Sequence, residues 1–320
     1  MNAGRIKNIL GNYGIIFVLI VLILVFSNFS ERFLLRNNIF NVLRQVSIVG
    51  IISVGMTFVI LTGGIDLSCG SVVGFACVGA AILMVNAQMN PVLASLVVCI
   101  GGLFLGLING AIIHWLKVPP FIATLGMMTS VRGIAYIITG GLPVFGFNPA
   151  FTRLGQGHFG IVPIPVLIMA AAFIFGVIFL NTTSAGRRIY GVGGNEEASR
   201  LSGVNIRNIK LLVYGVAGFM SALAGVVLLA RVNSGQPNAG MGYELDVITA
   251  VVLGGVRMAG GQGRLYMVII GVLIMGVMTN GMTMLGINEY VQMLIKGLVL
   301  IAAIAFDKFL NEQHAKEVIG

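Results

Sequence analysis

Three acidic side chains are the best candidates for chemistry in this sequence, which has only 10 Asp and Glu in 320 residues. Asp66 lies in GGIDLSCG (63–70), and Glu244 and Asp246 stand two apart in GMGYELDVITAVVLGG (240–255). Neighbouring carboxylates can act as a general acid and a general base. No His, Ser or Cys nucleophile stands near Glu244 and Asp246, and this argues against catalysis there.

The structural interpretation of these acids is helix capping. An ionised Asp at the centre of a bilayer costs roughly 2.5–3.5 kcal/mol even on the lower of the available scales. Asp66 should therefore lie near an interface or face polar groups, either as the cap of a helix beginning at Leu67 or in the path of a solute. Glu244 and Asp246 suit the start of a short outward-facing helix, where the helix dipole favours carboxylates.

Two Asn-Gly pairs offer neutral polar groups in apolar surroundings. In GLFLGLING (102–110), three glycines recur every fourth residue, which is the spacing of a close-packing helix face. Asn109 and Asn280 serve packing on one interpretation and donate to a passing hydroxyl-rich solute on the other. The candidate caps or pathway residues are Asp66, Asn109, Glu244, Asp246 and Asn280.

Metal and nucleotide sites are not indicated. The three histidines are scattered, and the three cysteines lie in apolar runs, as small core residues do. GGQGR (260–264) lacks the Lys-Ser/Thr ending of a P-loop, and GVGGNE (191–196) departs from the dinucleotide pattern at its last glycine. We expect no cofactor and no nucleic-acid partner, and any ATP that drives this chain would be hydrolysed by another protein.

Composition indicates the elements that hold these groups. Mean hydropathy is +1.02 and only 9% of residues are charged, against roughly 25% in soluble domains. The sequence therefore predicts an all-α polytopic membrane protein in contact with lipid, with residues 1–320 as one transmembrane domain. About ten membrane helices are expected, near 13–29, 39–62, 70–86, 91–114, 121–139, 163–180, 210–231, 245–256, 265–285 and 289–307.

The Lys and Arg residues predict the orientation of these helices. With the amino end inside, four fall outside (Arg32, Arg36, Arg153 and Arg231) and twelve inside. The twelve are Arg5, Lys7, Lys117, Arg187, Arg188, Arg200, Arg207, Lys210, Arg257, Arg264, Lys308 and Lys316. The excess of inner positive charge predicts that both termini and the polar segment 181–210 are cytoplasmic.

A faint internal repeat runs through the chain. Asp66 and Asp246 each stand eight residues before a glycine, and Asn109 and Asn280 each stand directly before one. The predicted orientation makes the two halves run in opposite directions, so the repeat would be inverted, as in many transporters. Chance matches of single residues are the other explanation.

Segment 181–210 is the one long polar stretch between the apolar runs. Asn195 suits an N-cap, acidic residues follow in the first turn, and Gly203 can end the helix. A helix this short is unstable alone. It should therefore dock on a partner, on the membrane domain or on both, and the alternative is that the segment is a plain linker. The predicted coupling residues are Asn195, Glu196, Glu197, Ala198, Arg200, Leu201 and Gly203.

The chain resembles the permease subunits of ribose-type sugar ABC importers, whose members carry ribose, xylose, allose, galactosides and a sugar-derived autoinducer. The resemblance runs from about residue 35 to 309 through GMTFVILTGGIDLSCGSVVG, VPPFIATLGMMTSVRGIAY, GVGGNEEASRLSGVNIRNIK, GYELDVITAVVLGGVRMAGGQGR and INEYVQMLIKGLVLIAAIAFD. Cys69 departs from the common Val, and Arg257-Met258 stands where small or hydroxyl residues are frequent. Neither departure touches the polar segment.

The resemblance implies a permease of the bacterial inner membrane that pairs with a second copy of itself. Its partners would be a cytoplasmic ABC ATPase with two fused nucleotide-binding halves and an extracytoplasmic sugar-binding protein. The family's ATPase-docking loop corresponds to Gly186–Lys210, with the coupling helix at about 195–203. Transport would follow alternating access, with the binding protein docking on the outer loops at 30–38, 140–162 and 232–244.

Two rival classes make different demands on the sequence. An ion-coupled secondary transporter of a small polar solute needs ionisable residues at mid-membrane to carry the ion, whereas the acids here are predicted at helix ends. A membrane enzyme needs a nucleophile–base pair or a metal cluster, and neither pattern is found in the sequence.

Overall fold

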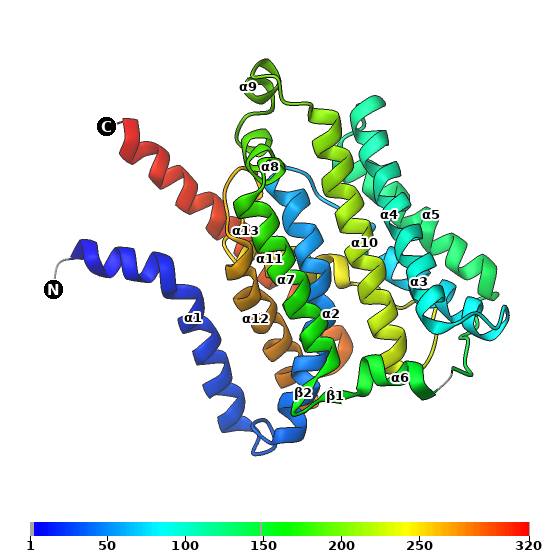
Figure 1. The fold of residues 1–320 in the computed structure, drawn as a ribbon. Helices are drawn as coiled ribbons and strands as arrows, with labels where there is room; N and C mark the ends of the chain where they lie inside the picture. Colours follow the sequence, from blue (N-terminus) through cyan, green and yellow to red (C-terminus); the bar gives the residue numbers. More distant parts are fainter. Residues whose placement is uncertain (1–2, 148, 320) are drawn as a thin grey trace.

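The computed structural model describes residues 3–147 and 149–319, which form a bundle of helices (Figure 1). The first part of the chain forms α1 (Ala3–Phe29), α2 (Arg36–Leu61), α3 (Cys69–Val85), α4 (Pro91–Trp115), α5 (Pro120–Thr139) and α6 (Pro149–Gln156). The middle forms β1 (His158–Phe159), β2 (Val162–Pro163), α7 (Ile164–Thr182), α8 (Ser184–Gly194) and α9 (Glu196–Leu201). The last part forms α10 (Ile206–Val232), α11 (Tyr243–Leu253), α12 (Leu265–Met284) and α13 (Glu289–Ile319).

All ten predicted apolar segments are helical, so the all-α polytopic class is confirmed. By length and composition, seven helices in the described part can cross a membrane: α2, α4, α5, α7, α10, α12 and the Glu289–Phe306 part of α13. Gly14–Phe29 and Cys69–Val85 are shorter apolar helices. At 11 residues, α11 is too short to cross a bilayer alone.

Two polar connections contain structure that the sequence analysis did not anticipate. Segment 181–210 holds the additional helix α8 ahead of α9. The 140–162 connection holds α6, and its strands β1 and β2 pair antiparallel. Figure 1 shows α9 at one end of the bundle and α6, β1 and β2 at the opposite end.

The long helices α2 and α10 form the buried centre and run in opposite directions. Near its start, α2 places Arg44 against the Gln156 carbonyl at the β1–β2 end, and its last residue, Leu61, accepts a hydrogen bond from Gly261 N. In contrast, α10 starts beside α9 and ends where Gln156 donates to the Arg231 carbonyl. The packing around them is matched, because α4 packs on α10 and α5 on α3, while α12 packs on α2 and α13 on α11.

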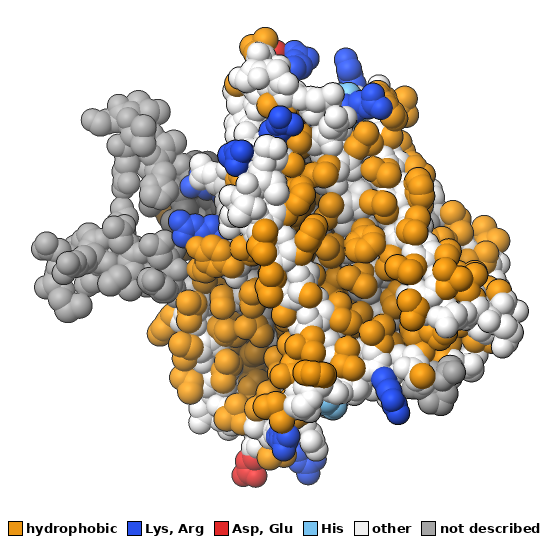
Figure 2. All heavy atoms as spheres, in the orientation of Figure 1, with side chains coloured by type: hydrophobic (Ala, Val, Ile, Leu, Met, Phe, Trp, Pro, Cys, Tyr) orange, Lys and Arg blue, Asp and Glu red, His pale blue; other side chains and the backbone are white. Residues whose placement is uncertain are grey.

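Close helix contact at the centre depends on glycine, as the four-residue spacing predicted. Gly102 faces Gly218 and Ala222 of α10, and a side chain at Gly106 would overlap the Tyr214 backbone. Apolar side chains gain little from association in lipid, so close backbone approach provides the attraction. On the outer surface, Figure 2 shows hydrophobic side chains covering the flank of the bundle, with Lys and Arg at its two ends.

Candidate functional site

The short helix predicted at about 195–203 is present as α9, Glu196–Leu201, with the capping residues that its sequence indicated. Asn195 Oδ1 accepts a hydrogen bond from Ala198 N at 2.8 Å, and Glu196 and Glu197 occupy the first turn. The helix ends at Leu201, and Gly203 follows with φ of +81°, a conformation that favours glycine. Local chemistry therefore sets both ends of α9.

The surface of α9 is open to solvent. Its residues are not buried, and the Leu201 side chain is 80% exposed. Arg200 pairs with Glu197 at 2.6 Å within the helix, and Lys210 at the start of α10 pairs with Glu196 at 2.9 Å. The second pair holds α9 near the membrane helices while leaving its outer face and Leu201 free for a partner.

Helix α8 anchors segment 181–210 to the bundle. Thr183 caps it by accepting from Gly186 N at 3.0 Å, and the Tyr190 hydroxyl donates to the Gly263 carbonyl at 3.0 Å. Burial raises the pKa of Tyr190 above its usual value, so this donor stays protonated at neutral pH. A side chain at Gly193 would overlap the Leu61 carbonyl at the end of α2, so α8 lies directly against the central helix.

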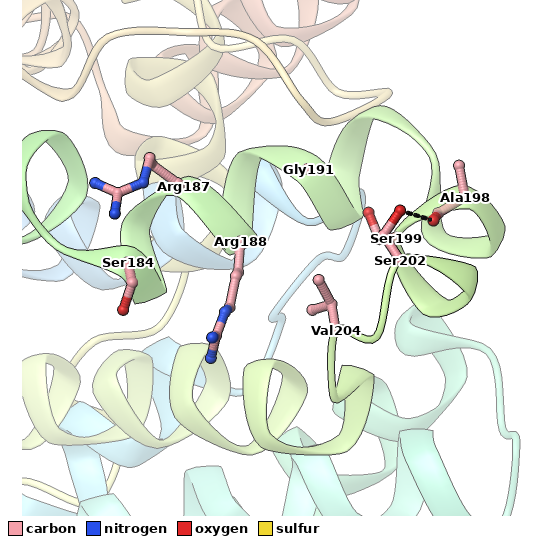
Figure 3. Close-up of a pocket in the computed structure, with 8 residues that line it drawn as sticks. All are labelled: Ser184, Arg187, Arg188, Gly191, Ala198, Ser199, Ser202 and Val204. Atoms are coloured by element: carbon pink, nitrogen blue, oxygen red, sulfur yellow. Dashed lines mark hydrogen bonds between the residues drawn. The ribbon is translucent and has the colours of Figure 1, made fainter.

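A surface pocket of about 470 Å³ separates α8 from α9 (Figure 3). Ser184, Arg187 and Arg188 of α8 line it on one side, and Ser199 of α9 and Ser202 just after α9 line it on the other (Figure 3). The Ser202 hydroxyl donates to the Ala198 carbonyl at 2.9 Å. Open, basic and rich in hydroxyls, this pocket suits contact with another protein better than enclosure of a small molecule.

A buried polar network surrounds Asp66 in the connection between α2 and α3. Its Oδ1 accepts from Ser68 N at 2.8 Å and from Ser68 Oγ at 2.6 Å, and Asn109 Nδ2 donates to Ser68 Oγ at 2.9 Å. The sequence placed the helix start at Leu67, but α3 begins at Cys69. Asp66 therefore orders the turn before the helix by binding Ser68, and Asn109 reinforces that turn.

The acids at the start of α11 have different partners. Glu244 Oε1 accepts from Gly242 N at 3.2 Å, whereas its Oε2 is buried beside Gly70 and accepts no hydrogen bond. Asp246 pairs with Lys296 of α13 at 2.8 Å. Glu244 thus binds the backbone N–H of Gly242, the residue before α11, whereas Asp246 forms an interhelical ion pair that the sequence did not indicate.

The two Asn-Gly pairs also differ in their surroundings. Asn280 and Asn38 exchange two hydrogen bonds, at 2.9 and 3.0 Å, and join α12 to the start of α2. Asn109 instead bonds to Ser68, and its Oδ1 is buried without a hydrogen bond. The carboxamide of Asn280 thus joins two helices, and its contact with a passing solute stays a prediction.

The described residues contain no group of three or more His, Cys, Asp or Glu side chains that could hold a metal ion. Cys69, Cys77 and Cys99 are free thiols and buried, as expected of small core residues.

Known proteins resemble this chain over nearly its whole length. Residues 38–304 match the family described as "Branched-chain amino acid transport system / permease component". The ribose import permease protein RbsC of Bacillus subtilis is 43% identical over 292 residues, which cover 91% of this chain and 90% of that protein. The chain belongs to this family of ABC permeases.

Other relatives place it in the ribose-type sugar importer group. RbsC of Escherichia coli K12 is 44% identical over 296 residues, covering 90% of this chain and 91% of the relative. The L-arabinose transport system permease protein AraH of the same strain is 37% identical, covering 99% and 94%. No solved structure matches the chain significantly. The permease is thus a multi-pass protein of the bacterial inner membrane.

Two cations of this permease were missed as site residues. Arg132 of α5 donates from Nη1 to the carbonyls of Pro237 and Ala239, at 2.8 and 2.7 Å, and so holds the α10–α11 connection. Lys296 of α13 binds Asp246. Each is a charge within an apolar run, and a charge in a membrane segment normally needs a polar partner. That rule identifies both residues, although it does not name their partners.

Proposed function

We propose that this permease imports a monosaccharide, a ribose-like pentose or a related sugar, by alternating access between two copies of the chain. A cytoplasmic ABC ATPase with two fused nucleotide-binding halves powers the cycle, and an extracytoplasmic sugar-binding protein delivers the solute. The names of the relatives support the sugar class, since they specify ribose, L-arabinose and D-allose. In this proposal the chain crosses the membrane ten times, and both termini and segment 181–210 lie in the cytoplasm.

The observation that carries the coupling role is the capped and exposed helix α9. The bundle holds it through α8 and the Lys210–Glu196 pair, yet Leu201 contributes almost nothing to the core. Movement of a partner that grips α9 would pass through α8, at Gly193 and Tyr190, to the end of α2 and the 254–264 connection. These contacts of α8 would connect the predicted coupling residues 195–203 to a central helix.

The packing of the bundle favours two halves that move against each other. The α2–α5 and α10–α13 groups repeat the same helix pairings, and their first helices run in opposite directions. This arrangement suits an inverted repeat around a pathway. Side chains do not follow the repeat closely, because Asp66 precedes α3 whereas Asp246 lies inside α11.

Reconstitution in liposomes with the candidate ATPase and binding protein tests this proposal. Uptake of labelled D-ribose and sugar-stimulated ATP hydrolysis should require all three proteins, with leucine as the control solute. Leu201→Glu should abolish stimulation because it places a charge on the exposed face of α9. Leu116→Glu is the matched control, since Leu116 is also exposed (70%) and follows the end of α4.

Two results would contradict the proposal. Uptake driven by a proton or sodium gradient without the ATPase would indicate an ion-coupled secondary transporter instead. Normal stimulation in Leu201→Glu would mean that α9 is only part of a linker.

A further inference from the structure

A pocket of about 540 Å³ opens between the end of α10, α11, α12 and α13. Its volume falls in the range of about 300–1,000 Å³ that is typical of small-molecule sites. Asn238, Thr249, Thr279 and Gln292 contribute polar groups to its wall. Asp246 of α11 and Lys296 of α13 also line the pocket and form an ion pair between the two helices.

The Asp246–Lys296 pair is balanced in charge but incomplete in hydrogen bonds. Asp246 Oδ2 binds Lys296 Nζ at 2.8 Å, and the side chains are only 12% and 22% exposed. The ammonium group has three N–H donors, and this contact uses one of them. Asp246 Oδ1 accepts no hydrogen bond and keeps some accessible surface, and Asp246 lines the pocket.

These unused groups match the chemistry of a sugar. One hydroxyl of a vicinal pair can accept from Lys296 Nζ, while its neighbour donates to Asp246 Oδ1. Hydrogen bonds to charged groups are stronger than neutral ones. The pair is neutral overall, so the pair with a bound uncharged polyol places no net charge beside the membrane span Glu289–Phe306.

The helix that carries Lys296 is the least enclosed of the membrane spans. Within Glu289–Phe306 none of the apolar window is buried, and α13 meets the rest of the chain mainly through α11. Movement of α13 relative to α11 would therefore separate Asp246 from Lys296 and change the spacing of the two sugar-binding groups.

We propose that Asp246 and Lys296 form a hydroxyl-binding subsite for the transported sugar in the pocket between α11 and α13. This inference rests on the proposed function, in that the ligand is the monosaccharide that the permease carries. Sugar binds here weakly and reversibly during passage, and separation of α13 from α11 releases it.

Protection of an introduced cysteine tests the subsite without the ATPase or the binding protein. Met293→Cys places a thiol on the pocket wall, where the native side chain is 66% exposed, and the native cysteines are buried. In nanodiscs, D-ribose at millimolar concentrations should slow labelling by a small thiol reagent. Glycine betaine, an osmolyte without hydroxyls, should not slow it, and 2-deoxy-D-ribose should protect less than D-ribose.

The decisive comparison adds Asp246→Asn with Lys296→Gln, which removes both charges together and keeps the site neutral. The D-ribose concentration for half-protection should rise about tenfold or more, because bonds to charged groups are lost. Leu116→Cys, an exposed position outside the pocket, should be insensitive to sugar. Unchanged protection in the neutral double variant, or none in the parent, would overturn the subsite.

A milder variant keeps the test valid if the double variant does not fold. Asp246→Glu preserves the ion pair and shifts the carboxylate by one methylene group, so the protein should fold while protection weakens. Uptake of D-ribose by the parent complex in liposomes is measured separately. Normal uptake without cysteine protection refutes the subsite alone, whereas absent uptake refutes the proposed function.

Discussion

Two lysine–carboxylate pairs join separate helices at nearly equal distances but in different surroundings. Lys210 meets Glu196 at 2.9 Å at the α9 end, where Glu196 is 51% exposed. Lys296 of the membrane span Glu289–Phe306 meets Asp246 of α11 at 2.8 Å, and the Asp246 side chain is 12% exposed. Exposed pairs contribute about 0–1 kcal/mol, whereas removing one partner of a buried pair costs about 3–5 kcal/mol. The energetic role of each pair thus follows from its surroundings rather than from its length.

The largest effect is expected from Lys296→Met. It leaves the Asp246 carboxylate without its cation and should lower the free energy of unfolding by about 3 kcal/mol. Lys210→Met leaves the half-exposed Glu196 carboxylate without its cation and should cost less than about 1 kcal/mol, because water can solvate that carboxylate. Denaturation of the purified permease in mixed micelles compares the two. Equal losses would show that the membrane environment does not distinguish the pairs.

An intermediate effect is expected from the asparagines. Asn280→Leu leaves the Asn38 carboxamide without both of its hydrogen bonds to residue 280, so it should cost about 2 kcal/mol. Asn109→Leu removes one bond to Ser68 together with an unsatisfied oxygen, and should cost about 1 kcal/mol. The same denaturation assay ranks them. The reverse order would mean that the Asp66–Ser68–Asn109 network is the more important of the two.

The smallest effect is expected from Glu196→Gln in the exposed pair. Stability should fall by about 0.5 kcal/mol at low ionic strength, and the difference should vanish near 1 M salt, where the Debye length is about 3 Å. Thermal unfolding across a salt series measures this. A loss that persists at high salt would show that Glu196 holds α9 by more than exposed electrostatics.

Much of the fold is predictable because it depends on local or compositional physics. Long apolar runs can satisfy their backbone groups in lipid only as helices, so all ten segments were identified. Helix α8 in segment 181–210 and the β1–β2 hairpin in the 140–162 connection were not predicted, because both segments are rich in polar and turn-forming residues. Contacts with the bundle stabilise α8, for example the hydrogen bond from the Tyr190 hydroxyl to the Gly263 carbonyl.

In the candidate site, too, local contacts were predictable and long-range contacts were not. By itself, the sequence determined the start and end of α9, because Asn195 and Gly203 act on backbone groups a few residues away. Only the tertiary structure paired Asp246 with Lys296, Arg132 with the 237–239 carbonyls, and Asn280 with Asn38. These partners lie about 50 to 240 residues apart in the chain. A buried polar group requires some partner, but the packing of distant helices decides which one it meets.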